Sequence, residues 1–91
     1  MFTVTDQIAG RWWNGKYGMA RRDVWLFQVD GTWRVDARQG KDDAKVWHSH
    51  FESEVDARAS VTGMLERTAE DGWRDLTRIV MDTDHRREAG S

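Results

Sequence analysis

Two histidines placed two residues apart are the first side chains in this sequence that could do chemistry. His48 and His50 lie in residues 45–51, where side chains alternate in the manner of a β-strand, so both imidazoles would project from one face of a sheet. Asp36 on the preceding segment could join them, and two imidazoles with a carboxylate can bind zinc or another divalent ion. Such a site needs third and fourth ligands that the sequence does not clearly place, because His85 falls in the C-terminal tail. We therefore expect no metal and no other cofactor.

Two arginines flank Asp36 on the same expected face. Arg34 and Arg38 stand two residues to either side of it, and Arg21-Arg22 could extend the positive charge. One interpretation is a stripe that binds phosphate or another anion. The other is cross-strand ion pairing on an exposed sheet, which the net charge of −2 favours. Either way, the candidate binding face on the sheet consists of five side chains: Arg34, Asp36, Arg38, His48 and His50.

Three apolar side chains share that outward face in the same interpretation: Val24, Leu26 and Val46. They could form a second small core covered by the N-terminal aromatic residues, which are Trp12, Trp13 and Tyr17. Alternatively, they form an exposed apolar patch that a partner or a second copy of the chain would cover.

The sequence carries none of the common catalytic motifs. It has no Gly-x-Ser-x-Gly elbow, no phosphate-binding glycine loop and no His-Glu-x-x-His pair. With no cysteine, disulfides, thiolate zinc sites and thiol catalysis are excluded together. A chain of 91 residues also has little volume for an enclosed pocket, so we expect a protein that is not an enzyme.

Three strands and one helix must position these side chains. Residues 23–29 and 32–38 are rich in β-formers and are joined by Asp-Gly, which predicts a hairpin, and residues 45–51 form a third strand. Ser53 followed by acidic residues predicts the start of a helix over residues 54–70, ended by Asp71-Gly72. Its apolar side would comprise Ala57, Val61, Met64, Leu65 and Thr68. The Asn14-Gly15 turn allows a fourth strand at an edge.

The alternation also predicts which residues face the helix. We assign the core face to Trp25, Phe27 and Val29, to Trp33, Val35 and Ala37, and to Trp47, Ser49 and Phe51. The side chains expected to be buried are Trp25, Trp33, Trp47 and Leu65.

Composition indicates one small domain. The six tryptophans supply much of the core that a chain this short needs, and residues 1–81 are expected to form the domain, with 82–91 a flexible tail. No signal peptide or membrane span is evident, which favours a cytoplasmic protein without membrane contact. The first 38 residues carry a net charge of +2 and residues 39–70 a net charge of −3, so the sheet is mildly basic and the helix acidic.

Residues 24–69 resemble a known layout. A strand that starts Gly31-Thr32-Trp33 and a strand-to-helix junction of the form Phe-x-Ser-x-x-x-Ala, residues 51–57, resemble the arm-type DNA-binding domains of phage integrases. They are also similar to small uncharacterised phage and actinobacterial proteins. The resemblance implies a three-stranded sheet backed by one helix, with its open face in the major groove. Carried over, that face would be Arg34, Asp36, Arg38, His48 and His50.

This chain departs from the integrase pattern in its charge. The family is basic on the face and in the loop that follows, where this sequence has Asp36 and Asp42-Asp43. The departure weakens the inference of DNA binding more than that of the fold.

Together these features predict an α+β domain: an antiparallel sheet of three or four strands with one amphipathic helix packed on one face. We expect a small non-enzymatic binding or regulatory protein that contacts a protein partner, with DNA binding through the sheet face as the alternative. Homodimerisation stays open.

Overall fold

The computed structural model describes residues 6–41 and 43–82. The strands are β1 (Asp6–Trp13), β2 (Arg22–Val29), β3 (Thr32–Gln39), β4 (Val46–Phe51) and the short β5 (Arg74–Asp75). The main helix is α1 (Glu54–Arg67), and 3-10 turns occur at η1 (Gly18–Ala20) and η2 (Ala69–Asp71). Residues 77–82 are helical. Of the predicted flexible tail, residues 82–91, only Asp82 is among the described residues, and it is helical; the other residues of the predicted tail lie outside the described ranges.

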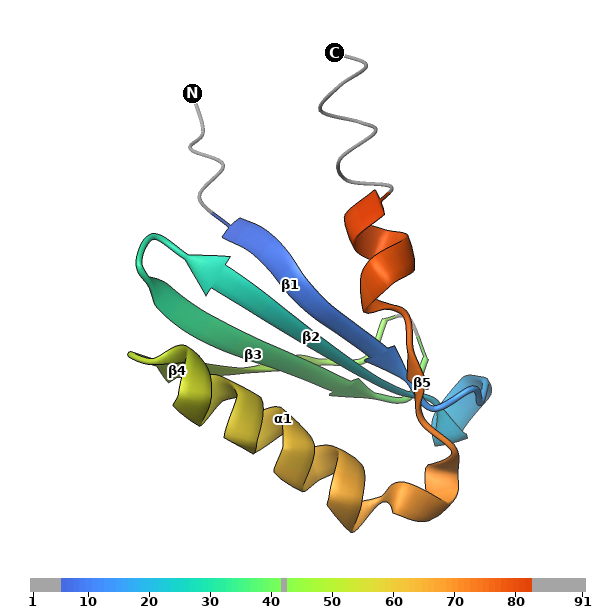
Figure 1. Cartoon of the computed structure of the whole chain (residues 1–91). Coiled ribbons are helices and arrows are strands. Elements are labelled where there is room, and N and C mark those ends of the chain that lie inside the picture. The colour runs from blue at the N-terminus through green and yellow to red at the C-terminus, as the bar shows by residue number, and fades with distance from the viewer. Residues whose placement is uncertain (1–5, 42, 83–91) are drawn as a thin grey trace.

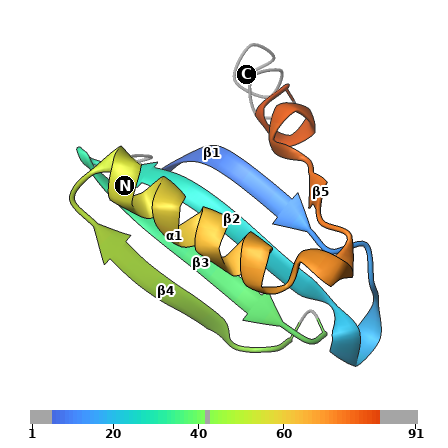
Figure 2. The same ribbon diagram turned by 60° about the horizontal axis from the view of Figure 1, so that its bottom comes forward.

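The strands form one antiparallel sheet in the order β4-β3-β2-β1-β5. α1 lies diagonally across one face of the sheet, over β2 and β3. The helical residues 77–82 lie beyond β1 and β5, at the edge of the sheet opposite β4 (Figures 1 and 2). The predicted α+β class with one packed helix is confirmed. The sheet has five strands, because β1 pairs with residues 23–29 of β2, with an irregularity between Ile8 and Gly10, and β5 pairs with the end of β1.

The Asp30-Gly31 turn sets the register of the central hairpin. Both residues have positive φ, 48° and 86°, as a two-residue type I′ turn requires, and Val29 pairs with Thr32. Odd-numbered residues of β2 therefore lie opposite even-numbered residues of β3. The predicted face of β2 was wrong for this reason: Trp25 pairs with Asp36 and so points away from α1.

The core lies between α1 and the other side of the hairpin. Its buried residues are Val24, Leu26, Val35, Ala57 and Val61, with Trp12, Trp33, Phe51, Met64, Leu65 and Trp73 packed around them. Of the four side chains predicted to be buried, Trp33 and Leu65 are partly buried against this core. Trp25 is half-buried on the opposite face, and Trp47 is 63% exposed.

Trp47 is exposed because of the path of α1. The helix starts close to the end of β4, where Phe51 joins the core, and then runs away from that strand toward β2 (Figure 2). Trp47 is on the helix side of the sheet, opposite Ala37, but the helix has moved off the β4 edge at that level. The face of Trp47 was predicted correctly, but the prediction that its side chain is buried was wrong.

The ends of α1 follow from local chemistry. Ser53 Oγ accepts a hydrogen bond from the Asp56 amide at 3.1 Å, and acidic residues occupy the first turn, as predicted. The helix ends at Arg67, three residues earlier than predicted, and the chain tightens into η2 before Gly72 takes a left-handed conformation with φ 73°. The Trp73 indole then donates to the Thr68 carbonyl and hydroxyl, which ties this turn to the helix.

No helix within residues 6–41 and 43–82 is both long and apolar enough to cross a membrane.

Candidate functional site

The face of the sheet opposite α1, called here the open face, carries all five side chains of the predicted binding face. Arg34 pairs with His50 and Asp36 with His48 across β3 and β4. Arg38 lies opposite Asp23 of β2. The structure thus brings the predicted residues together on one surface.

Asp36 is the centre of one ion-pair cluster. It is only 6% exposed, and its Oδ1 accepts from Arg34 Nε at 2.9 Å and lies 2.7 Å from His48 Nδ1. The Asp36–His48 contact crosses from β3 to β4, as in the second of the two interpretations of the arginine pattern, whereas Arg34 and Asp36 belong to the same strand. The arginine is therefore oriented by a carboxylate from its own strand.

A second cluster, which the sequence analysis missed, surrounds Asp23. Its side chain is fully buried and contacts three guanidinium groups: Arg11 at 2.5 Å, Arg21 at 2.9 Å and Arg38 at 3.1 Å. Burial by itself would raise the pKa of Asp23, but hydrogen bonds from Arg21, Arg11 and Arg38 outweigh it and hold the pKa below its ordinary value. Asp23 is thus an ionised carboxylate that fixes three arginines from three parts of the chain.

The arginines lie over aromatic rings of the same face. Arg11 and Arg38 are 4.6 and 5.2 Å from the Trp25 ring centroid, and Arg34 is 4.8 Å from that of Phe27. These separations are within the range of cation–π attraction. The open face is therefore a layer of guanidinium groups resting on aromatic rings, with carboxylates between them.

The clusters leave this face positive. Four arginines (Arg11, Arg21, Arg34 and Arg38) surround two carboxylates (Asp23 and Asp36), a balance of +2 with neutral histidines. His48 and His50 are exposed beside them. Arg22, by contrast, pairs with Gln39 on the α1 side and binds Asp71, so only the first of the Arg21-Arg22 pair extends the face.

The predicted apolar patch does not exist as a surface. Val24 and Leu26 are 3% and 0% exposed in the core under α1, because β2 has the opposite orientation to that predicted. Val46 lies on the open face opposite Arg38. A second core beneath the N-terminal aromatic residues is therefore absent too: Trp12 packs on the main core.

Within the described ranges, His48 and His50 have no third ligand. No group of three or more histidine, aspartate or glutamate side chains there could hold a metal ion. His85 lies outside those ranges.

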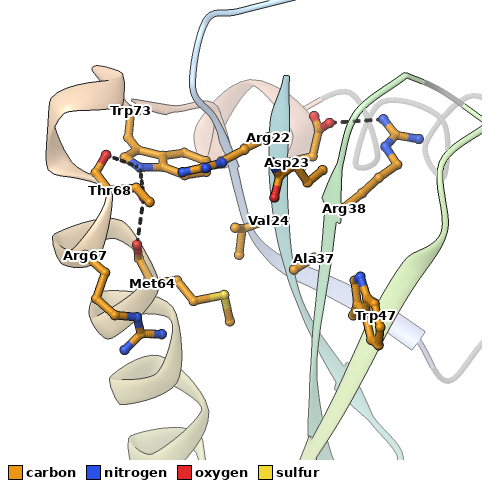
Figure 3. Close-up of a pocket in the computed structure, with 11 residues that line it drawn as sticks. Arg22, Asp23, Val24, Ala37, Arg38, Trp47, Met64, Arg67, Thr68 and Trp73 are labelled. Atoms are coloured by element: carbon orange, nitrogen blue, oxygen red, sulfur yellow. Dashed lines mark hydrogen bonds and ion pairs between the residues drawn. The ribbon is translucent and has the colours of Figure 1, made fainter. Parts of the chain in front are cut away.

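A cavity of about 340 Å³ opens on the other side of the sheet, at the end of α1. Figure 3 shows its walls: Met64 and Trp73 on the helix side, with Val24, Ala37 and Trp47 on the sheet side. The cavity could not be predicted from the sequence, because it depends on where α1 leaves the sheet.

Comparison with known proteins finds no match to this chain among family models, curated proteins or solved structures.

Proposed function

We propose that the chain is a cytoplasmic, non-enzymatic binding protein of regulatory type, and that it contacts a protein partner through the open face. The observation that carries the proposal is the layer of arginines held over Trp25 and Phe27. Aromatic residues and arginine are enriched in protein–protein interfaces, and Trp and Arg are frequent among the residues that dominate binding energy.

The ion pairs that hold the arginines in place support a role of the open face in binding a protein partner. Asp23 and Asp36 already hold the guanidinium groups in fixed positions on a regular sheet. Side chains that are ordered before binding lose less conformational entropy when the partner arrives. The face can therefore offer long, charged side chains with little of the usual entropic penalty.

The charge of the face specifies the partner surface. With a balance of +2 on the open face, we expect an acidic patch on the partner. On the opposite side of the domain, α1 carries exposed Glu54, Asp56 and Glu66 against exposed Arg58 and Arg67, a net charge of −1, so the helix is less suited to the same acidic patch. Such complementarity selects the orientation of binding and raises the association rate.

Affinity capture from lysate of the native host tests the proposal when it is run with matched variants. The double variant Arg34→Gln/His50→Gln removes one formal positive charge from the open face. The control variant Arg58→Gln removes one formal positive charge from the exposed surface of α1. We expect a protein retained by the wild type and by Arg58→Gln, with or without nuclease, and lost with the double variant. Capture that the double variant leaves unchanged would refute a role for the open face.

DNA binding is the second candidate, because the open face is positive although the chain as a whole is negative. Three or four phosphate contacts would make log K fall with log salt at a slope of about −3 to −4. Fluorescence anisotropy with a random duplex between about 50 and 200 mM salt measures that slope. A slope in this range, lowered by about one in Arg34→Gln, would replace the protein partner with DNA. No binding at low salt would remove this candidate.

A further inference from the structure

The cavity at the end of α1 opens on the α1 side of the sheet, opposite the open face, although Asp23 and Arg38 of the open-face cluster also contribute to its lining. Val24 and Ala37 of the sheet form its floor. Met64 of α1 lines it where the helix leaves the sheet. Its volume of about 340 Å³ lies at the lower end of the range of about 300–1,000 Å³ found for small-molecule pockets.

Two indole rings make the side walls (Figure 3). Trp47 is 63% exposed although it lies on the helix side of the sheet, so a large apolar surface faces solvent there. The Trp73 Nε1–H is already bound to the Thr68 carbonyl and hydroxyl, at 3.1 and 2.9 Å. Trp73 therefore offers the cavity an apolar ring and no free donor. The walls suit a flat or aliphatic group.

Some of the positive groups at the cavity are already paired with acids and others are not. Arg38 lines the cavity but is paired with Asp23, which lines it too. Arg67 lines it, is exposed, and makes no hydrogen bond or ion pair with any residue that the structure describes. The Lys45 ammonium lies 4.6 Å from the Trp47 ring centroid. Arg22, also in the lining, is already engaged by Asp71 at 3.0 Å. Arg67 is thus the lining cation that is available to an anionic ligand, and Lys45, which is outside the lining, lies next to Trp47.

Gly63 makes room for the guanidinium of Arg67. A Cβ at position 63 would come within 3.2 Å of Arg67 Nη1, so the side chain lies back along the helix over the glycine. Glycine in a helix interior is about 1 kcal/mol less favourable than alanine. The contact shows that the Arg67 guanidinium lies close to the helix surface beside the cavity.

We propose that this cavity binds a small organic carboxylate whose apolar body lies between Trp47 and Trp73 and whose carboxylate is bound by Arg67. A guanidinium and a carboxylate form charge-assisted hydrogen bonds that are roughly twice as strong as neutral ones. The apolar walls select the body of the ligand, and the unpaired cation selects its charge.

NMR titration of the intact chain tests this with 4-phenylbutyrate and its uncharged amide as probes. The six tryptophans give six indole N–H signals, which single Trp→Phe variants assign. We expect 4-phenylbutyrate to shift the signals of Trp47 and Trp73 and to bind at least about tenfold more tightly than the amide, because only the acid can form the charge-assisted bond.

Two variants distinguish binding in the cavity from nonspecific electrostatic attraction of the acid to the domain. Arg67→Gln should weaken 4-phenylbutyrate about tenfold and leave the amide unchanged, since only the charge is removed. Arg58→Gln removes a charge from the same helix outside the cavity lining and should change neither. Equal affinity for acid and amide, an equal effect of both variants, or shifts at Trp25 in place of Trp47 and Trp73 would overturn the proposal. The proposal would also be overturned if millimolar 4-phenylbutyrate caused no shifts while an acidic peptide shifted the β4 amide signals. That result would assign the cavity to a peptide.

Discussion

Replacing Asp23 with asparagine removes the charge on which the open face is built. The carboxylate is fully buried, and its three arginine partners are only 12–25% exposed. Breaking a buried ion pair by neutralising one partner costs about 3–5 kcal/mol, because the remaining charges stay desolvated. These guanidinium groups retain some contact with water, so we expect a loss near the lower end, about 3 kcal/mol. A domain of 91 residues has roughly 5–14 kcal/mol of stability in total, which makes this loss large.

The same variant has a distinct pH signature. The pKa of Asp23 is lowered in the folded state, so its ionised form stabilises the fold above its unfolded pKa of about 3.9. That contribution is lost as the pH falls through the folded pKa. We therefore expect the stability of the wild type to fall below about pH 4, and that of Asp23→Asn to fall less over the same range.

Urea unfolding followed by tryptophan fluorescence, at pH values from about 7 to 3, measures both effects. Asp43→Asn is the matched control, because Asp43 is an exposed carboxylate in the loop before β4, and it should change stability by less than about 0.5 kcal/mol. A loss of less than about 1 kcal/mol at pH 7 in Asp23→Asn would contradict this prediction. So would a free energy of unfolding that falls equally steeply below about pH 4 in Asp23→Asn and in the wild type.

Three further predictions concern the core and the helix. Leu26→Ala should cost about 2–5 kcal/mol because Leu26 is fully buried, whereas Trp47→Ala should cost under about 1 kcal/mol; urea unfolding that ranks them in reverse would contradict the observed faces. Gly10→Ala should destabilise by about 1–3 kcal/mol, because its Cβ would overlap the Trp12 ring, and an unchanged melting temperature would count against that packing. Gly63→Ala should raise the free energy of unfolding by up to about 1 kcal/mol, since Arg67 needs to move by only a few tenths of an ångström; a loss of stability would show that the contact is rigid.

The candidate site was predictable where it depended on a single strand or on one strand pair. Arg34, Asp36 and Arg38 alternate along β3, and His48 and His50 along β4, so their common face followed from the period of two. Asp23 and Arg11 were missed because their importance comes from pairing across β2, and the face of β2 was predicted the wrong way round. A usable signal was present: a two-residue Asp-Gly turn already requires Trp25 to lie opposite Asp36. This signal was not used, because Trp25 and Phe27 were assigned to the core face as large aromatic residues.

Local chemistry in the sequence was enough to determine the hairpin, the third strand and the start of α1. The Asp30-Gly31 turn, the alternation of residues 45–51 and the Ser53 cap act within a few residues of chain, so each could be recognised without knowledge of the rest. The Asn14-Gly15 turn allowed a fourth strand, but tertiary structure alone decided three other features: the pairing of β5 with β1, the burial of Asp23, and the angle at which α1 leaves β4. Each of these depends on contacts between segments far apart in the chain. The exposure of Trp47 and the cavity beside it follow from that angle, because a side chain on the correct face is buried only where another element covers it.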